Sequence, residues 1–73
     1  MDYKKHIEIN SSKRFGRPCI KGSRISVYDV LNWLASGMTI QEITEDFPEL
    51  NKEQILACLS YAADREHKLR IAS

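Results

Sequence analysis

The chain has 73 residues, which is enough for one domain and excludes two. Its formal net charge of +1 argues neither for nor against a nucleic-acid partner. A domain of this size buries a small core that rarely supplies more than about 3–5 kcal/mol, so a disulfide, a metal or a second chain usually supplements it.

The cysteines and histidines are too few and too widely spaced to predict a metal centre. Cys19 and Cys58 form no C-x-x-C pair, and neither His6 nor His67 lies near them, whereas structural zinc needs four ligands at recognisable spacings. We therefore expect no metal and no cofactor. No apolar stretch resembles a secretory signal or a membrane span. We expect a cytoplasmic protein with two reduced core cysteines, although two cysteines permit one disulfide, and with no membrane partner. Self-association is the expected supplement to the core.

Basic side chains gather in the first third of the chain. Residues 1–26 hold seven lysines and arginines against two acidic residues, and residues 27–73 hold four against eight. Such an asymmetry is a hint of an interaction arm. A solvated basic surface that balances acidic helices explains the same pattern equally well.

A short strand is predicted near the start of the chain. In HIEIN, Ile7 and Ile9 alternate with polar neighbours, and Tyr3 and Lys5 extend the same face backwards. Alternation with period two among β-branched residues is typical of a half-buried strand. The polar stretch NSSKRFG that follows, residues 10–16, is typical of a turn.

The stretch GRPCIKGSRISV, residues 16–27, predicts a basic hairpin that leads into a helix. Pro18 lacks an N–H and suits a strand start or edge, and Gly22 can adopt the positive φ of a tight turn. We assign Arg24 mainly to structure, because its guanidinium can satisfy loop or helix-end carbonyls. Lys21 and Gly22 stand in the reverse order of a phosphate-binding loop, so the similarity to that motif is coincidental.

A change of apolar period to about 3.6 predicts a first helix, with Ser26 as its N-cap. Gly37 is the expected C-terminal stop. The apolar face of this helix consists of Val27, Val30, Leu31 and Leu34, with Trp33 beside it.

Two capping-box patterns predict two further helices. Thr39 with Glu42 opens a short second helix that Pro48 closes, and Asn51 with Gln54 opens the third. The second helix is expected to bury Ile40, Ile43 and Phe47. The third is expected to bury Ile55, Leu56, Leu59, Ala62 and Ala63, with Tyr61 beside this stripe and Glu53, Ala57, Ser60 and Asp64 opposite it. The predicted fold is mainly α, a trihelical helix-turn-helix with a short N-terminal β-hairpin.

We expect a single domain with three parts. These are a basic β-type segment (1–26), a three-helix core (27–66) and a short tail (67–73). Leu69 and Ile71 in the tail are candidates for binding a partner chain, although a frayed helix end is the plainer interpretation.

Polar residues at the start of the third helix are candidates for reading DNA. A helix-turn-helix places the N-terminal end of its second helix in the major groove, and here that end carries Asn51, Lys52 and Gln54. The acidic residues of the last two helices oppose this, because they repel phosphate. The basic segment would then supply most phosphate contacts, from Lys13, Arg14, Arg17 and Lys21.

Nothing in the sequence predicts catalysis. His6 and His67 have no nucleophile pattern near them, and Cys19 has apolar neighbours. Because no nucleophile, base and orienting group can be proposed together, we expect a protein that is not an enzyme.

A set of motif residues carries a resemblance to a known family. It consists of Gly16, Pro18, Ile20, Gly22, Ser23, Arg24, Ile25 and Val27, then Gly37 and Thr39, then Phe47, Pro48 and Leu50, and finally Ala57, Leu59 and Tyr61. This pattern, which covers about residues 10–65, resembles the small bacterial and archaeal domain-of-unknown-function family four-three-three.

The resemblance implies a homeodomain-like or winged-helix-like helix-turn-helix fold. It also implies the antitoxin of a type II toxin–antitoxin pair, commonly encoded beside a PIN-like ribonuclease. Such antitoxins are expected to form homodimers, bind their toxin and repress their own operon by binding operator DNA. Few residues follow the third helix here, which leaves room for toxin binding through the folded domain. The alternative is a protein-interaction adaptor that does not touch DNA.

Overall fold

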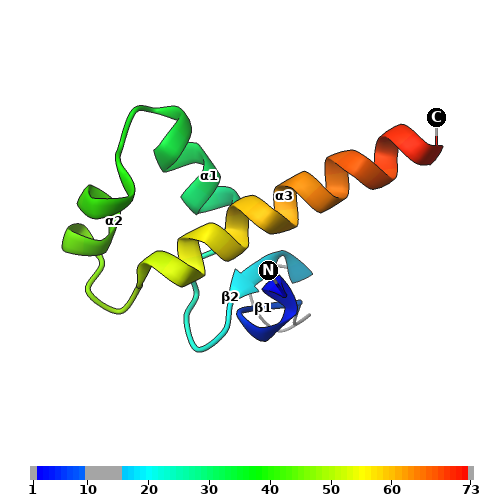
Figure 1. The fold of residues 1–73 in the computed structure, drawn as a ribbon. Helices are drawn as coiled ribbons and strands as arrows, with labels where there is room; N and C mark the ends of the chain where they lie inside the picture. Colours follow the sequence, from blue (N-terminus) through cyan, green and yellow to red (C-terminus); the bar gives the residue numbers. More distant parts are fainter. Residues whose placement is uncertain (1, 10–15, 73) are drawn as a thin grey trace.

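A computed structural model describes the backbone of residues 2–9 and 16–72 and the side chains as far as residue 68. Its elements, in chain order, are η1 (Tyr3–Lys5), β1 (Ile7–Ile9), β2 (Pro18–Ile20), α1 (Val27–Ala35), α2 (Ile40–Asp46) and α3 (Lys52–Ala72). Three helices and a short antiparallel pair of strands make a mainly α fold, as predicted (Figure 1). The predicted 10–15 turn lies outside the described residues.

Helix α3 is the central element of the fold. It contacts α1 and α2 on one side and η1 and β1 on the other, and its C-terminal end projects beyond the other elements (Figure 1). Ile55, Ala57 and Cys58 of α3 are fully buried. They complete a core with Ile20, Val30 and Ile43, which are also inaccessible to solvent.

The predicted apolar stripe of α3 is partly wrong. Ala57, predicted on the outer face, is fully buried, whereas Leu59 is 39% exposed and Ala63 is exposed. A stripe derived from one sequence assumes a single packing partner. Because α3 packs against elements on both sides, its buried arc is broader and turned towards the N-terminal segment.

Each helix begins with a capping box. In α1 the Ser26 hydroxyl accepts from Asp29 N at 3.0 Å, and the Asp29 carboxylate accepts from Ser26 N at 3.1 Å. In α2 the predicted pair of Thr39 and Glu42 makes the same exchange at 3.1 and 2.9 Å. The hydrogen bonds from Thr39 hold the pKa of Glu42 below its ordinary value. The predicted stops are confirmed as well, since Gly37 has φ +106° after α1 and Pro48 follows the end of α2.

The short N-terminal hairpin is confirmed, but its strands differ from the predicted ones. Strand β1 pairs antiparallel with β2, with Ile7 opposite Ile20. The turn at Gly22 has the expected positive φ, yet it is followed by a single bridge, between Cys19 and Ser26. Because α1 begins at the next residue, no chain remains there for a second full strand.

The predicted backward extension of the first strand is wrong. Tyr3 and Lys5 belong to the 3-10 helix η1, and the Asp2 side chain caps it by accepting from Lys4 N at 3.1 Å. A local side-chain cap of this kind competes with strand pairing. The alternation of apolar and polar residues gives no indication of such a cap.

Tyr3 joins η1 to α3. Its hydroxyl donates a hydrogen bond to the Asp64 carboxylate, and its ring meets the Tyr61 ring edge-on, with centroids 5.4 Å apart. Lys68 pairs with the same carboxylate at 3.1 Å. The hydrogen bonds from Tyr3 and Lys68 lower the pKa of Asp64, and the bond to Asp64 raises the pKa of Tyr3.

Both cysteines are buried and unpaired, Cys19 in β2 and Cys58 in α3. Burial raises the pKa of the Cys58 thiol to about 12, so this side chain stays neutral at physiological pH. They are core side chains, as the sequence predicted.

Replacing Tyr3 with Phe is expected to lower stability in a pH-dependent way. The depressed pKa of Asp64 stabilises the fold above the ordinary carboxyl pKa of about 4, and this contribution is lost as pH falls through the folded value. The raised pKa of Tyr3 stabilises the fold below about pH 10, and this contribution is lost as pH rises through the folded value. Urea denaturation across pH should therefore give the largest difference from wild type near neutrality. A difference that is constant with pH would contradict this contact.

Candidate functional site

The predicted base-reading residues at the start of α3 are engaged in the helix cap. Asn51 N donates to Gln54 Oε1 at 2.8 Å, and Gln54 N donates to Asn51 Oδ1 at 2.9 Å. Bidentate readout of adenine needs both the oxygen and the NH₂ of an amide side chain. Here each oxygen already accepts from a backbone N–H, so bidentate readout of a base would have to share that oxygen with the cap.

The surface around this helix start is acidic. Lys52 is exposed and is the only basic residue between positions 36 and 54. The exposed acidic side chains of α2, of the α2–α3 connection and of the first turn of α3 are Glu42, Glu45, Asp46, Glu49 and Glu53. An excess of carboxylates at this end repels the phosphates that any major-groove contact must approach.

The opposite charge is found beside β2 and on the connection from β2 to α1. Residues 16–26 hold Arg17, Lys21 and Arg24, all exposed, and no acidic residue. Lys13 and Arg14, the other two predicted phosphate contacts, lie outside the described residues. Arg17 directly precedes β2, and Lys21 and Arg24 lie on the connection from β2 to α1, so this stretch presents three cations.

The hydrogen bonds of the turn between β2 and α1 include two made by Ser23. Arg24 is exposed and bonds to no other described residue. The Ser23 hydroxyl donates to Ile20 O at 2.9 Å and accepts from Ile25 N at 3.1 Å, and so satisfies both polar groups of the turn.

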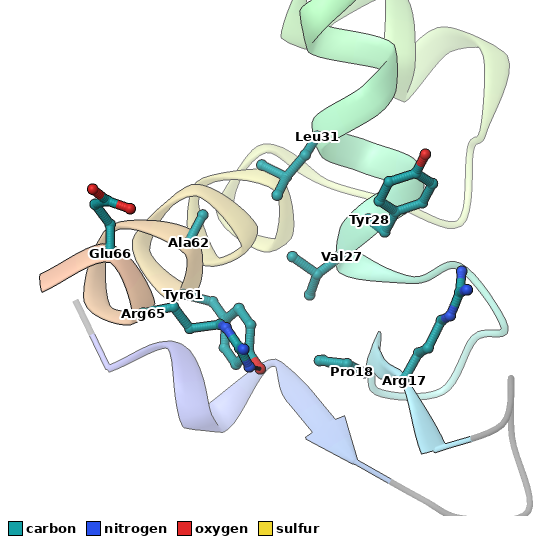
Figure 2. A pocket seen from close by; sticks show the side chains of 9 residues that line it. All are labelled: Arg17, Pro18, Val27, Tyr28, Leu31, Tyr61, Ala62, Arg65 and Glu66. Atoms are coloured by element: carbon teal, nitrogen blue, oxygen red, sulfur yellow. Dashed lines mark hydrogen bonds between the residues drawn. The ribbon is translucent and has the colours of Figure 1, made fainter. Parts of the chain in front are cut away.

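A groove of about 480 Å³ lies between β2, the start of α1 and the middle of α3 (Figure 2). Figure 2 shows Arg17 and Tyr28 on one side of it and Tyr61 and Arg65 on the other. Its lining residues are Arg17, Pro18, Val27, Tyr28, Leu31, Tyr61, Ala62, Arg65 and Glu66.

Each side of the groove holds an arginine against a tyrosine. The Arg17 guanidinium lies 5.8 Å from the Tyr28 ring centroid, and that of Arg65 lies 5.8 Å from the Tyr61 centroid. Arg65 Nη1 also donates to the Tyr61 hydroxyl at 3.1 Å. Both distances fall within the range of a cation–π interaction. Tyr28 is 61% exposed, which is high for an aromatic side chain.

The groove joins residues that the sequence analysis had not connected. Arg17, Pro18 and Tyr61 were expected to have separate roles, while Tyr28 and Arg65 were not singled out. No spacing rule relates them, because they meet only through the packing of β2, α1 and α3. Leu69 and Ile71 lie in the last turns of α3, and their side chains are outside the described part.

The remaining motif residues occupy structural positions. Pro18 begins β2, Ile20 is fully buried, and Gly16 has φ +78°. Within the described part of the chain, no three His, Cys, Asp or Glu side chains are grouped to hold a metal ion. Among the described residues, no helix is long and apolar enough to cross a membrane.

Comparison with known proteins gives one family. The sequence model of the family described as "Protein of unknown function (DUF433)" matches residues 7–62. An uncharacterized protein of Sinorhizobium fredii, y4eO, is 36% identical over 47 residues, which are 64% of this chain and 21% of that protein. A DUF433 member protein from Anabaena variabilis has a crystal structure similar to this fold, with a TM-score of 0.78 and 21% identity over 90% of this chain and 65% of that one. The chain thus spans about a fifth of its curated relative, and the structural likeness supports the fold alone.

Substitutions at Asn51 test whether its side chain stabilises α3 as a helix cap. Asp caps a helix as well as Asn does, so Asn51→Asp should leave the free energy of unfolding within about 0.5 kcal/mol of wild type. Asn51→Ala removes the acceptor for Gln54 N and should cost about 1 kcal/mol. Urea denaturation measures both. Equal stability of all three proteins would mean that the cap bond does not stabilise α3.

Proposed function

Because the chain belongs to the DUF433 family, as its motif residues indicated, we propose that it is the antitoxin of a type II toxin–antitoxin pair. In this proposal it acts in the cytoplasm, binds and neutralises a PIN-like ribonuclease, and binds operator DNA as a homodimer. It has no catalytic role of its own. Two surfaces support the proposal, the groove for a protein partner and the basic segment for DNA.

The separation of charge is the observation that carries the DNA-binding part. Arg17, Lys21 and Arg24 lie within residues 16–26, which hold no carboxylate, whereas α2 and the start of α3 hold an acidic surface. Phosphate contacts supply most of the non-specific affinity of a protein for DNA. DNA therefore approaches the basic segment first, and α3 is not the main source of affinity.

Phosphate contacts position a protein on DNA but carry no direct sequence information. Of the three predicted base readers, Lys52 is the one whose side chain is not engaged in the α3 cap. Dimerisation would double the phosphate contacts and allow two half-sites about one helical turn apart to be recognised. Operator recognition in this arrangement combines Lys52, DNA shape and half-site spacing.

The capped amides and the acidic surface also support a second candidate function. A protein-interaction adaptor would use the groove and leave DNA unbound, and it would need neither Asn51 nor Gln54 to be free. Both candidate functions include binding of a protein partner, and only the antitoxin also binds DNA.

Co-expression with the neighbouring genes tests the partner, and a gel shift on the chain's own promoter tests the DNA. The antitoxin proposal predicts a co-purifying ribonuclease-like protein and a retarded promoter fragment at low salt. A co-purifying ribonuclease without retardation identifies the adaptor. Retardation without a partner leaves a DNA-binding protein and rejects the antitoxin, and the absence of both rejects both functions.

Replacing Arg14, Arg17 and Lys21 with Ala should flatten the salt dependence of operator binding. Each phosphate contact contributes about 0.9 to the slope of log K against log salt, so three contacts account for up to about 3 per protomer. Fluorescence anisotropy over a salt series measures the slope, and circular dichroism checks the fold. Lys52→Ala is the comparison variant, with an expected loss of about 1 at most. An unchanged slope in the triple variant would mean that the basic segment does not contact DNA.

A further inference from the structure

The floor of the groove is apolar. Pro18, Val27, Leu31 and Ala62 line it between the two tyrosines. Its volume of about 480 Å³ lies in the range of pockets that enclose a ligand or an inserted side chain. Leu31 and Ala62 are half-buried, so an apolar side chain seated against them would remove further apolar surface from water.

Each side of the groove carries an arginine whose guanidinium lies against a tyrosine ring. Arg17 and Arg65 are both exposed, and each lies against a tyrosine ring. A guanidinium is weakly hydrated and matches a carboxylate in bidentate geometry. Arginine and tyrosine around an apolar pocket are typical of the residues that dominate the energy of protein interfaces. Glu66 is the one carboxylate in the lining, so cations are in excess.

We propose that this groove receives a segment of a partner protein in which an apolar anchor side chain is flanked by carboxylates. The anchor rests on Val27, Leu31 and Ala62, and the carboxylates pair with Arg17 and Arg65 on either side. The inference rests on the protein-binding part of the proposed function, and it names the chemistry of the segment that binds. It also assigns roles to Tyr28 and Arg65, which no motif had indicated.

The charges favour such a segment over a second copy of this chain. Placing two of these grooves face to face would bring four arginines against two glutamates. Seating the acidic α2 region of another copy in the groove would use different surfaces on the two chains, and contacts of that kind grow into rings or open assemblies. A nucleic acid would bring phosphate beside Glu66 and would leave the aliphatic floor without an apolar partner.

Two matched synthetic peptides test the proposal directly. Both are amphipathic helices with leucines one turn apart, and one carries glutamates at the flanking positions where the other carries lysines. Fluorescence anisotropy at low salt should show binding of the acidic peptide about tenfold tighter or more, because unlike charges lie at contact distance on a partly desolvated surface.

Variants on neighbouring positions of α3 supply the control. Ala62→Glu places a carboxylate in the groove and should abolish binding of the acidic peptide. Ala63→Glu makes the same change one residue along, at an exposed position outside the groove, and should leave binding within about twofold. Arg65→Gln should weaken binding, whereas Arg24→Gln should not. Circular dichroism and thermal unfolding confirm that each variant is folded.

Several outcomes would overturn the proposal. These are equal affinity for the two peptides, no binding of either peptide, equal losses in Ala62→Glu and Ala63→Glu, and displacement of the acidic peptide by a single-stranded oligonucleotide. A fifth is conversion of dimer to monomer by Ala62→Glu in sedimentation, with no peptide bound by wild type, which would identify the groove as a contact between copies.

The same variants separate this inference from the function on which it rests. If the co-expressed ribonuclease is retained by both Ala62→Glu and Ala63→Glu, the protein is an antitoxin and the groove is not its binding site. If the acidic peptide binds as expected but no ribonuclease co-purifies, the groove is a binding site and the antitoxin function is wrong.

Discussion

The burial of α3 between two layers is the constraint on which the rest of the structure depends. Ala57 and Cys58 have no exposed surface, because α1 and α2 pack from one side of the helix and η1 and β1 from the other. Small side chains allow this close approach, and a close-packed interior has little room for larger ones. The neutral thiol of Cys58, whose pKa burial raises to about 12, suits this position.

Tyr61 connects the packed N-terminal segment to the groove. Its ring meets that of Tyr3, whose hydroxyl is bonded to Asp64, and Arg65, four residues further along α3, lies over the same ring. Because Tyr61 contacts both Tyr3 and Arg65, the position of the N-terminal segment affects the position of Arg65, which lines the groove. A change in η1 reaches the candidate binding surface through a single aromatic ring, without any contact between η1 and a ligand.

Local interactions explain what the sequence predicted well. The capping residues Ser26, Thr39 and Asn51 act on backbone groups three residues away, so their patterns are visible in any short stretch. The burial of Ala57 and the pairing of Arg17 with Tyr28 depend instead on how distant segments pack. A single sequence contains no periodicity that encodes those contacts, and the groove was therefore missed.

The start of α3 shows why residue type alone is a weak guide to a DNA interface. Asn and Gln are good readers of adenine and good caps for the same reason, since each offers an amide oxygen next to an NH₂ group. An amide oxygen that already accepts from a helix N–H has one lone pair left for a base, so the two roles compete. The capping box decides this competition at Asn51 and Gln54 in favour of the helix. Affinity for an anionic or acidic partner must then come from cations outside the cap, and Arg17 is the described cation that belongs both to the basic segment and to the groove.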